Sequence, residues 1–427
     1  MWINKKKFFV LVPLLTLSFV GCSHTNVEPK KTDPKLQQSS GVKGYTDIDQ
    51  NISLYTKGIN KGYIGSFAEY KKRYFRIWRK QPIFDKKDAM WAYRVFHAPR
   101  GYGENKQILP QSFYTKMLHN ANFNNFATLN KKAYTLRRTN LRVFPTSKAL
   151  FYNPKKAGEG FPFDYLQNSS IAPYKPLFIS HYSLDKGWAY VTSSFAQGWV
   201  RAQDIKLISD QEAKKWQESL QQIIVQDDGS VTDKDNKFLF YSQIGQMLPK
   251  ICHLQTDSKN YYEDILPFNE QTIAMILQQL QDGIYGWGGL YNERDCSSTM
   301  RDFFAPFGVW LPRNSKAQSR VGKVIVLKGM DDATKLKTIK QYGVPFETLL
   351  YKRGHIVLYL GTFNDNVLVF QNMWGITTRN KDGKSGRYII GKPVITTIDF
   401  GNNIAGYDPK KSSLLHKIES MNIVTQK

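Results

Sequence analysis

The sequence predicts a chain of several small domains that ends in an α+β domain. At 427 residues the chain is too long for one ordinary hydrophobic core, and two to four domains are expected. Its texture changes from mixed, mostly helical sequence to short β segments between turns, and then to a helix followed by two apolar strands. A helical segment followed by a sheet is typical of an α+β domain.

The first residues indicate export. A basic "NKKK" precedes a short apolar run and then "GCS", which is typical of a secretory signal and too short to span a bilayer comfortably. The cysteine after Gly21 resembles the bacterial lipobox, with Phe19 where the pattern usually has leucine. This resemblance implies a signal peptide at 1–22 and diacylation of Cys22. Ser23 resembles the outer-membrane sorting pattern if the source is Gram-negative, so we expect a periplasm-facing lipoprotein of the cell envelope. An ordinary signal peptide and an uncleaved anchor are the alternatives.

The formal charge of +25 makes polyanions the expected partners: nucleic acid, anionic lipid or an acidic polymer such as the cell wall. No sequence signature of nucleic-acid binding accompanies the charge, which argues against nucleic acid. A basic surface that serves only solubility is the alternative.

Upstream of the last domain the chain divides by composition. Residues 23–50 are polar and rich in Pro, Ser and Lys, which is typical of a flexible tether. Residues 51–133 predict a mostly helical domain, because stretches such as "FAEYKKRYFRIWRK" carry apolar residues at helical spacing.

Residues 134–208 consist of short β segments separated by turns. Two Gly-Trp pairs, ending at Trp188 and Trp199, predict the two sides of a hairpin. The pattern resembles the bacterial SH3-like barrel, in which such tryptophans close a small core. A second β stretch, at 209–257, follows a helical segment and resembles a second SH3-like module.

The last domain has a cysteine at the start of a helix. In "YGWGGLYNERDCSSTMRDFF" a Gly-rich loop becomes a helix at Cys296. The helix is predicted from one apolar stripe that follows the cysteine at i, i+3, i+4 and i+7: Met300, Phe303, Phe304 and Phe307. Free N–H groups and the positive end of the dipole stabilise a thiolate there, so Cys296 is a candidate nucleophile. A disulfide with Cys252 is the alternative in an oxidising envelope.

A thiolate nucleophile needs a base, and the base needs a group that orients it. His355 opens the strand "HIVLYL", whereas the other six histidines lie in the tether, the upstream modules or a polar tail. The next strand ends at Gln371. If the hairpin loop is odd-numbered and centred on Phe363, His355 and Gln371 lie opposite each other on one face, whereas a one-residue slip sends them to opposite faces. Gln371 then orients the imidazole toward Cys296.

The motifs "YGWGG", "DCS" and "GH" with the later glutamine resemble the NlpC-type cysteine peptidases of bacterial cell walls. The stretches "YGENK", "NLRVFPT" and "GFPFDYLQNSS" resemble the multidomain lipoprotein branch of that family. The resemblance implies an α+β papain-like (NlpC-type) peptidase domain at 258–427, preceded by two small all-β SH3-like barrels and a helical N-terminal stabilising domain. Two positions depart from the pattern. Ser298 replaces a glycine, and Gln371 stands where this branch usually has histidine, although the wider family uses His, Asn or Gln.

The resemblance implies hydrolysis of the γ-D-glutamyl–meso-diaminopimelate bond in murein stem peptides. Cys296 would attack the amide carbon, and His355 would take the thiol proton and later protonate the leaving amine. The Cys296 N–H and, by resemblance, the Tyr285 hydroxyl would meet the oxyanion. For Tyr285, packing on Trp287 is the alternative. The charge of Asp295 opposes thiolate formation, and the resemblance makes it the carboxylate that binds the substrate's free α-amine.

The predicted substrate-binding set is Asp295, Ser297, Trp287, Arg313 and Ser315. For Arg313, Asn314 and Ser315 a loop cap around the helix exit is the alternative. In the family an SH3-like module walls one end of the groove and restricts it to stems with a free N-terminal L-Ala. Trp188 and Trp199 are expected in the core of that module.

Two other functions stay open at this stage. One is a catalytically inactive murein-binding envelope scaffold, against which the complete Cys/His/Gln set argues. The other is a papain-like amidase acting on N-acetylmuramoyl-L-Ala, or an acyltransferase. The sequence contains no metalloprotease, P-loop or dinucleotide motif, so no metal or cofactor is expected. We expect a monomer.

Overall fold

The computed structural model describes residues 41–379 and 381–426. The predicted signal peptide, the predicted lipidation site Cys22 and residues 23–40 of the predicted tether lie outside the described residues. Among the helices of the described ranges, none is long and apolar enough to cross a membrane.

Residues 41–50 do not behave as the end of a tether. Val42 is buried in an apolar cluster of the C-terminal domain, and the Gly44 carbonyl accepts a hydrogen bond of 2.7 Å from the Thr397 N–H. The tether prediction is therefore wrong for these ten residues. Their polar composition hides the few apolar and backbone groups that pair with the C-terminal sheet.

The next part of the chain is helical, as predicted. Its helices are η1 (Ile52–Leu54), α1 (Phe67–Tyr74), α2 (Arg76–Arg79), α3 (Lys86–Ala89), α4 (Trp91–Val95), α5 (Gln111–Asn120) and η2 (Phe123–Asn125). Ser66 caps α1 by accepting a hydrogen bond from the Glu69 N–H. The rings that follow, including Trp78, pack in one cluster with both β modules and with Ala305 of the C-terminal domain. This helical part therefore contacts all three other parts.

The first β module is a seven-stranded sheet in the order β3-β2-β6-β5-β4-β1-β7. Its strands are β1 (Lys131–Thr135), β2 (Thr139–Arg142), β3 (Gln167–Ile171), β4 (Pro176–Tyr182), β5 (Trp188–Thr192), β6 (Gln197–Arg201) and β7 (Ile205–Leu207), with η3 (Ala202–Asp204) before the last. The predicted hairpin is β5–β6, in which Tyr190 pairs with Trp199. Trp199 is fully buried, as expected, whereas Trp188 is only half-buried.

The second β module follows α6 (Asp210–Glu218), whose Ser209 and Glu212 form a capping box. It has a two-stranded sheet, β10-β9, and a three-stranded sheet, β11-β8-β12. The strands are β8 (Gln221–Ile224), β9 (Ser230–Thr232), β10 (Phe238–Tyr241), β11 (Met247–Pro249) and β12 (Tyr261–Tyr262), with η4 (Lys250–Cys252) and η5 (Ser258–Asn260) between the last two. The last strand comes from beyond residue 257, where the sequence places the end of this module.

The C-terminal domain is α+β, as predicted, with a six-stranded antiparallel sheet in the order β13-β18-β14-β15-β16-β17. The strands are β13 (Lys323–Val326), β14 (Thr348–Lys352), β15 (His355–Phe363), β16 (Asn366–Arg379), β17 (Ser385–Thr397) and β18 (Ser420–Ile423). The helices are α7 (Glu270–Gln281), η6 (Trp287–Asn292), α8 (Cys296–Phe304), η7 (Ala305–Phe307), α9 (Ser315–Gln318), α10 (Asp332–Tyr342), α11 (Pro409–Ser412) and α12 (Leu414–Lys417).

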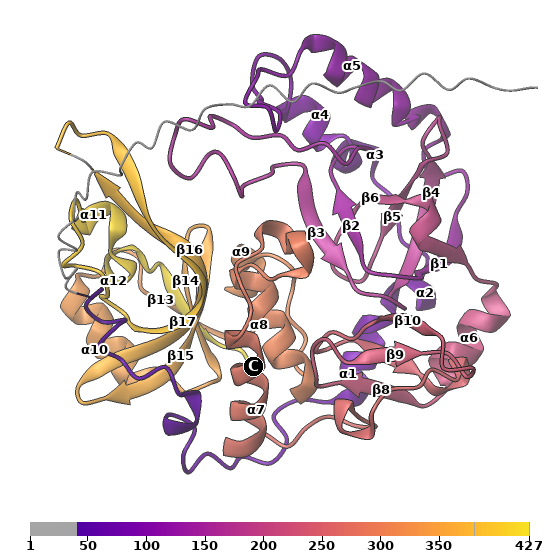
Figure 1. Ribbon diagram of the computed structural model, residues 1–427. Helices are drawn as coiled ribbons and strands as arrows, with labels where there is room; N and C mark the ends of the chain where they lie inside the picture. The colour runs from indigo at the N-terminus through magenta and orange to yellow at the C-terminus, as the bar shows by residue number, and fades with distance from the viewer. Residues whose placement is uncertain (1–40, 380, 427) are drawn as a thin grey trace, which may run out of the picture. The chain divides into compact units, whose positions relative to one another are not determined.

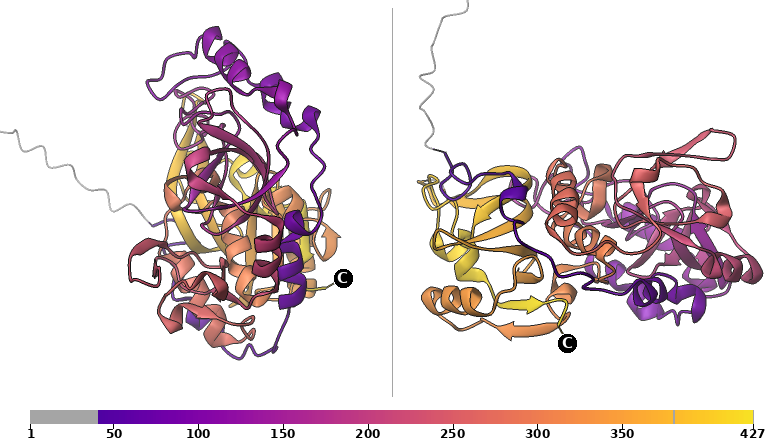
Figure 2. Two further views of the ribbon diagram at one scale, coloured as in Figure 1. Left: turned by 90° about the vertical axis from the view of Figure 1, so that its right-hand side faces the viewer. Right: turned by 90° about the horizontal axis from the view of Figure 1, so that it is seen from below.

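Helix α8 buries the apolar stripe that the sequence predicts. Met300, Phe303, Phe304 and Phe307 are all fully buried and pack with residues of β15 and β16. Helices α7 and α8 stand between the six-stranded sheet and the two β modules (Figure 1), and the view from below shows the same order (Figure 2). The start of α8 therefore lies where the sheet, the helices and the first β module meet.

Candidate active site

Helix α8 begins at Cys296, directly after its N-cap Asp295. The Asp295 carboxylate accepts a hydrogen bond of 2.8 Å from the Ser298 N–H, and the Ser298 hydroxyl accepts one of 2.9 Å from the Asp295 N–H. Ser298, the residue that replaces the family's glycine, thus completes a capping box. This cap leaves the N–H of Cys296 unused by the helix.

Cys296 and Cys252 are both free thiols, which excludes the disulfide alternative. Burial and the adjacent Asp295 carboxylate raise the pKa of the Cys296 thiol to about 12, against a smaller lowering by the backbone N–H groups of Ile356 and Ser297. The stabilisation of a thiolate by the helix N-terminus is therefore outweighed at this buried position. In the free protein the sulfur carries its proton, and a base must remove it.

His355 is held by Gln371, with 2.9 Å between its Nε2 and the Gln371 Oε1. The two residues share a face of the sheet, as predicted, but the predicted loop is wrong. The β15–β16 loop has two residues, Asn364 and Asp365, both with positive φ.

A one-residue bulge in β15 brings the side chains of His355 and Gln371 to the same face of the sheet. On β15 the pairing shifts between Tyr359 and Gly361, so one extra residue enters the strand. Continued from Leu358 opposite Phe370, the register leaves Gln371 as a diagonal neighbour of His355 rather than opposite to it. Without the bulge, the even loop would send the two side chains to opposite faces of the sheet.

Thr396 in β17 fixes the orientation of the Gln371 amide. The Gln371 Nε2 donates to the Thr396 Oγ1 at 2.7 Å, so the carbonyl Oε1 faces His355. Because a carbonyl oxygen only accepts, the proton of the neutral imidazole lies on Nε2. The lone pair is then on Nδ1, which is the arrangement that a base requires.

Replacement of Thr396 by valine should lower kcat about tenfold with little change in KM, because the Gln371 amide loses the partner that holds Oε1 toward the imidazole. Steady-state kinetics on a stem peptide would measure this. Thr397→Val, one residue along the same strand, is the matched control and should keep the wild-type kcat. Equal kcat values in the two variants would show that Thr396 does not orient the Gln371 amide.

The pKa of His355 is lowered to about 4, first by burial and then by the positive charge of Lys352. His355 is therefore neutral at all pH values above about 4 and is protonated as the pH falls through that value. The acid limb of kcat/KM should accordingly lie near pH 4 rather than near the ordinary histidine value of about 6.5. A pH–rate profile measures this directly. A limb at pH 6–7 would contradict it.

Tyr285 and Trp287 lie beside these residues. With Cys296, His355 and Gln371 they line one cavity of about 150 Å³. Burial, followed by the thiolate that Cys296 would form at high pH and by the Asp295 carboxylate, raises the pKa of the Tyr285 phenol well above its usual value, so its hydroxyl stays a donor. Its ring contact is with Trp374, at 6.0 Å between centroids.

Trp287 and the two glycines after it join the site to the first β module. The Trp287 Nε1 donates to the Asp164 carbonyl at 2.9 Å. Gly288 and Gly289 have φ of 60° and 83°, and a Cβ on Gly288 would come within 2.9 Å of the Gln167 carbonyl oxygen in β3. The motif "YGWGG" therefore needs glycine at these two positions, because of both the backbone conformation and the close approach of β3.

Arg313 pairs with the residue that caps α8. Its guanidinium pairs with both carboxylate oxygens of Asp295, at 3.0 and 2.7 Å, and donates to the hydroxyls of Ser169 in β3 and Ser297, at 2.7 and 2.9 Å. Burial alone would raise the pKa of Asp295, but Arg313 and the hydrogen bonds from Ser298 outweigh it and leave the pKa below its ordinary value. Neither Arg313 nor Asp295 lines the cavity, and Arg313 contacts the start of α8 through Asp295.

Ser297 and Ser315 also lie outside the cavity lining. The Ser297 hydroxyl donates to Asp295 at 3.1 Å. Ser315 begins α9, which Asn314 caps by accepting a hydrogen bond of 2.9 Å from the Ala317 N–H, so the loop-cap alternative describes Asn314. The substrate-binding roles of Asp295, Ser297, Trp287, Arg313 and Ser315 stay predictions.

Sequence reasoning missed three residues of the site. Thr396 reaches Gln371 only through the β16–β17 register, which leaves no local signal. Lys352 and Arg387 also line the cavity. Lys352 stands in "KRGH" and pairs with His355 across a two-residue turn. A basic residue so close in sequence to a candidate histidine could have indicated that Lys352 belongs to the site.

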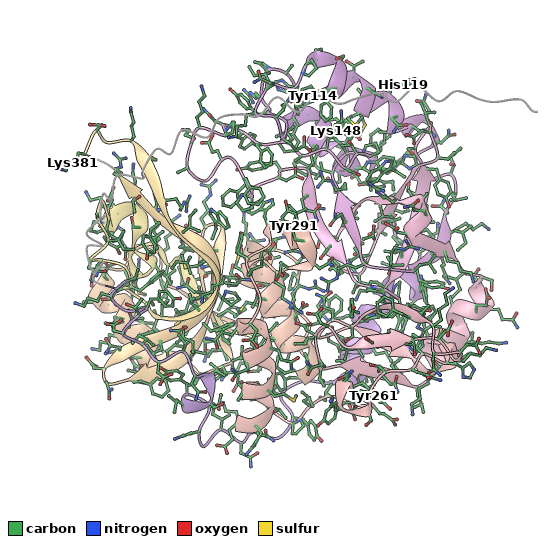
Figure 3. The ribbon with its side chains drawn as sticks, viewed as in Figure 1. Tyr114, His119, Lys148, Tyr261, Tyr291 and Lys381 are labelled. Atoms are coloured by element: carbon green, nitrogen blue, oxygen red, sulfur yellow. The ribbon has the colours of Figure 1, made fainter. Side chains whose placement is uncertain are left out.

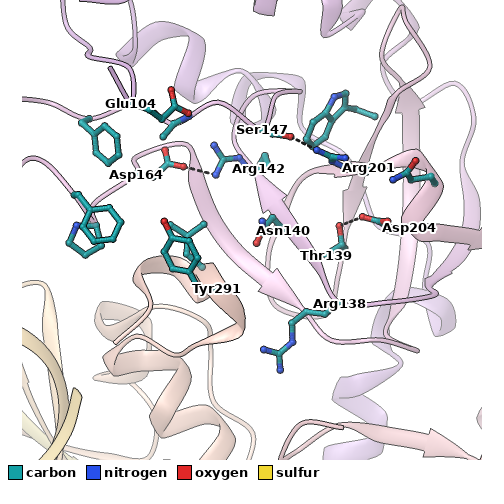
Figure 4. Close-up of a pocket in the computed structure, with 17 residues that line it drawn as sticks. Glu104, Arg138, Thr139, Asn140, Arg142, Ser147, Asp164, Arg201, Asp204 and Tyr291 are labelled. Atoms are coloured by element: carbon teal, nitrogen blue, oxygen red, sulfur yellow. Dashed lines mark hydrogen bonds and ion pairs between the residues drawn. The ribbon is translucent and has the colours of Figure 1, made fainter. Parts of the chain in front are cut away.

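A larger cavity of about 570 Å³ lies on the first β module and is bordered by Tyr291. Tyr291 belongs to η6, which lies beside β3 (Figure 3). Three pairs of polar groups in this cavity contact each other (Figure 4): Arg142 with Asp164 at 2.6 Å, Thr139 with Asp204 at 2.8 Å, and Arg201 with Ser147 at 2.8 Å. Neither a cysteine nor a histidine lines it, so the candidate nucleophile and candidate base of the smaller cavity have no counterpart here.

Three family models match the chain. Residues 282–381 match the NlpC/P60 family, residues 8–126 the NLPC_P60 stabilising domain (N-terminal) and residues 149–201 an SH3 domain of the SH3b1 type. None of the curated proteins matches the chain.

Solved structures of the same family resemble it. A novel NlpC/P60 endopeptidase from Photobacterium damselae subsp. piscicida is similar with a TM-score of 0.77 and 21% identity, over 89% of this chain and 98% of that one. An NlpC/P60 family protein from Bacillus cereus is similar with a TM-score of 0.39 and 12% identity, over 68% of this chain and 98% of that one.

The fold and the cysteine–histidine site define a multidomain protein with a thiol site in its last domain. The chain is similar to NlpC/P60 proteins in its last domain, to their N-terminal stabilising domain near its start and to an SH3 domain between them, and its fold resembles that of a solved NlpC/P60 endopeptidase. The predicted family and the predicted fold class are both confirmed. NlpC/P60 proteins are generally cysteine peptidases that act on peptidoglycan. The exact domain boundaries stay predictions.

Proposed function

We propose that this protein is a cysteine endopeptidase that hydrolyses the γ-D-glutamyl–meso-diaminopimelate bond of murein stem peptides, with a preference for stems that have a free N-terminal L-Ala. The observation that carries the proposal is the constellation around one cavity. A protonated thiol at a helix N-terminus lies beside a neutral histidine whose Nε2 is held by a fixed amide.

In the proposed reaction the Nδ1 of His355 accepts the thiol proton as Cys296 attacks the amide carbon. The oxyanion that forms would be met by the free N–H of Cys296 and by the Tyr285 hydroxyl. His355 then returns the proton to the leaving amine, and water hydrolyses the thioester. Thiolate and imidazolium arise together in this step, which fits a resting site in which both groups are neutral.

Asp295 supports the amine preference by its charge. Its Oδ2 receives a hydrogen bond from Arg313, and an ionised carboxylate oxygen can accept more than one. Its lowered pKa keeps it ionised where a substrate amine is protonated.

The test uses purified residues 23–427 with L-Ala-γ-D-Glu-meso-diaminopimelate and its N-acetylated form, and reads the products by mass spectrometry. Release of L-Ala-D-Glu from the free tripeptide alone would support both the reaction and the amine preference. Cleavage of both forms would keep the endopeptidase and remove the preference. If neither is cleaved while the protein still sediments with murein, the scaffold replaces the enzyme.

We also propose that Cys22 carries a lipid that attaches the mature protein to the outer membrane. The motif "GCS" after a short apolar run supports this. Cys22→Ala should move the protein from the membrane to the soluble fraction in cell fractionation. Retention of that variant in the membrane fraction would contradict the proposal.

A further inference from the structure

A second cavity, of about 430 Å³, adjoins the candidate active site and is strongly basic. The loop after β13, helix α10, the turn between β14 and β15, and helix α12 all contribute to it. The cationic residues that line it are Lys328, Lys335, Lys352, Arg353 and Lys417.

Little in the cavity neutralises these charges. Glu419 lines it too, and His416 is within 3.3 Å of Asp332. Lys335 is buried and donates to the Leu415 carbonyl at 3.3 Å. Within residues 41–379 and 381–426, no carboxylate forms an ion pair with the other four cationic side chains.

Lys352 and Lys417 show the effect of these unneutralised charges on a pKa. The pKa of Lys352 is lowered to about 8, first by burial and then by the charge of Lys417. Like charges are thus held close together without a counter-ion, which is costly unless an anion binds there.

Lys352 also joins this cavity to the site. It lines both the basic cavity and the cavity that contains Cys296 and His355, and it pairs with His355 across the β14–β15 turn. A peptide that passes Cys296 toward this end would reach the cationic groups directly.

We propose that this cavity is the leaving-group subsite and that Lys328, Lys352, Arg353 and Lys417 bind carboxylates of the peptide on the C-terminal side of the scissile bond. The proposal rests on the proposed function. In the tripeptide the diaminopimelate end carries two carboxylates and one ammonium group and so has a net negative charge, whereas the L-Ala end carries the free α-amine, and the site has the same polarity. Asp295 lies on the side of the first β module, where Arg313 ties it to Ser169, and the lysines lie beyond His355.

The kinetic test compares the tripeptide with the same peptide amidated at its diaminopimelate carboxyls. Wild-type protein should prefer the free carboxylates by about tenfold in kcat/KM, the effect of losing a hydrogen-bonded charge pair. Lys328→Glu/Lys417→Glu should lose this preference through KM, because neither side chain lines the cavity of Cys296. Lys323→Glu/Lys337→Glu, which makes the same change of charge at exposed positions, should retain it. An equal preference in all three proteins would overturn the proposal.

A binding test separates this proposal from the enzymatic one. Titration calorimetry on Cys296→Ala, with and without Lys328→Glu/Lys417→Glu, would use the tripeptide, its amide and poly(glycerol phosphate). Tripeptide affinity that falls about tenfold in the lysine variant supports the subsite even if the wild type cleaves nothing. Unchanged affinity overturns the proposal. Lysine-dependent binding of the phosphate polymer without binding of the tripeptide also overturns it, in favour of an acidic wall polymer.

Discussion

Replacement of Cys296 by alanine is expected to abolish peptide cleavage, with kcat lowered by at least about 10⁴-fold. The thiol is the group from which His355 can take a proton and which can form the covalent intermediate, and alanine has neither capacity. The change is small at a buried position, and the cap made by Asp295 and Ser298 does not use the sulfur. Circular dichroism should therefore show a folded protein.

Cys252→Ala is the matched control for this prediction. Cys252 is a free, half-buried thiol that does not line the cavity of Cys296, and burial raises its pKa to about 11. This variant should keep the wild-type kcat. If Cys252→Ala were inactive and Cys296→Ala active, the nucleophile would be assigned to the wrong cysteine.

Replacement of Arg313 by methionine is expected to lower the free energy of unfolding by about 3–5 kcal/mol. Arg313 and Asp295 are 8% exposed each, and removal of the guanidinium leaves an ionised carboxylate buried without its counter-charge. The same change removes the bond from Arg313 to Ser169 that ties α8 to β3. Urea denaturation followed by tryptophan fluorescence would measure the loss.

Two further variants give this prediction its controls. Arg320→Met removes an exposed arginine from the same part of the chain and should change stability by less than about 0.5 kcal/mol. Arg313→Met/Asp295→Asn removes the unpaired charge and should recover part of the loss. A double variant less stable than Arg313→Met alone would show that the ion pair is not the cause.

The sequence was enough to single out Cys296, His355 and Gln371 as candidates for one site. Each of these residues stands where the local chemistry of the sequence changes, although β16 continues through Gln371 to Arg379 rather than ending there as predicted. Cys296 precedes an apolar helical stripe, His355 opens a strand, and Gln371 interrupts an apolar one. The structure brings all three to one cavity.

What the sequence could not predict depends on pairings between distant segments. The bulge in β15 decides the face on which His355 and Gln371 meet, and nothing in "HIVLYLG" announces an extra residue. The burial that leaves the thiol of Cys296 protonated also comes from several elements at once. For the same reason residues 41–50 could not be placed on the C-terminal sheet from their composition alone.

Arg313 was predicted as a substrate-binding residue, but the contacts that the structure gives it are with Asp295, Ser169 and Ser297. Its place in "LPRNSKAQ" suggests a subsite, but it pairs with Asp295, the residue that caps α8. Asp295 precedes it by 18 positions, and no helical or strand period links positions so far apart.

The most direct test of the account is to identify which bond of L-Ala-γ-D-Glu-meso-diaminopimelate is broken, and by which cysteine. Wild-type protein, Cys296→Ala and Cys252→Ala would each be incubated with the tripeptide and the products quantified by mass spectrometry. The account predicts equal amounts of L-Ala-D-Glu and meso-diaminopimelate from the wild type and from Cys252→Ala, and neither product from Cys296→Ala. Release of L-Ala instead, or undiminished cleavage by Cys296→Ala, would contradict it.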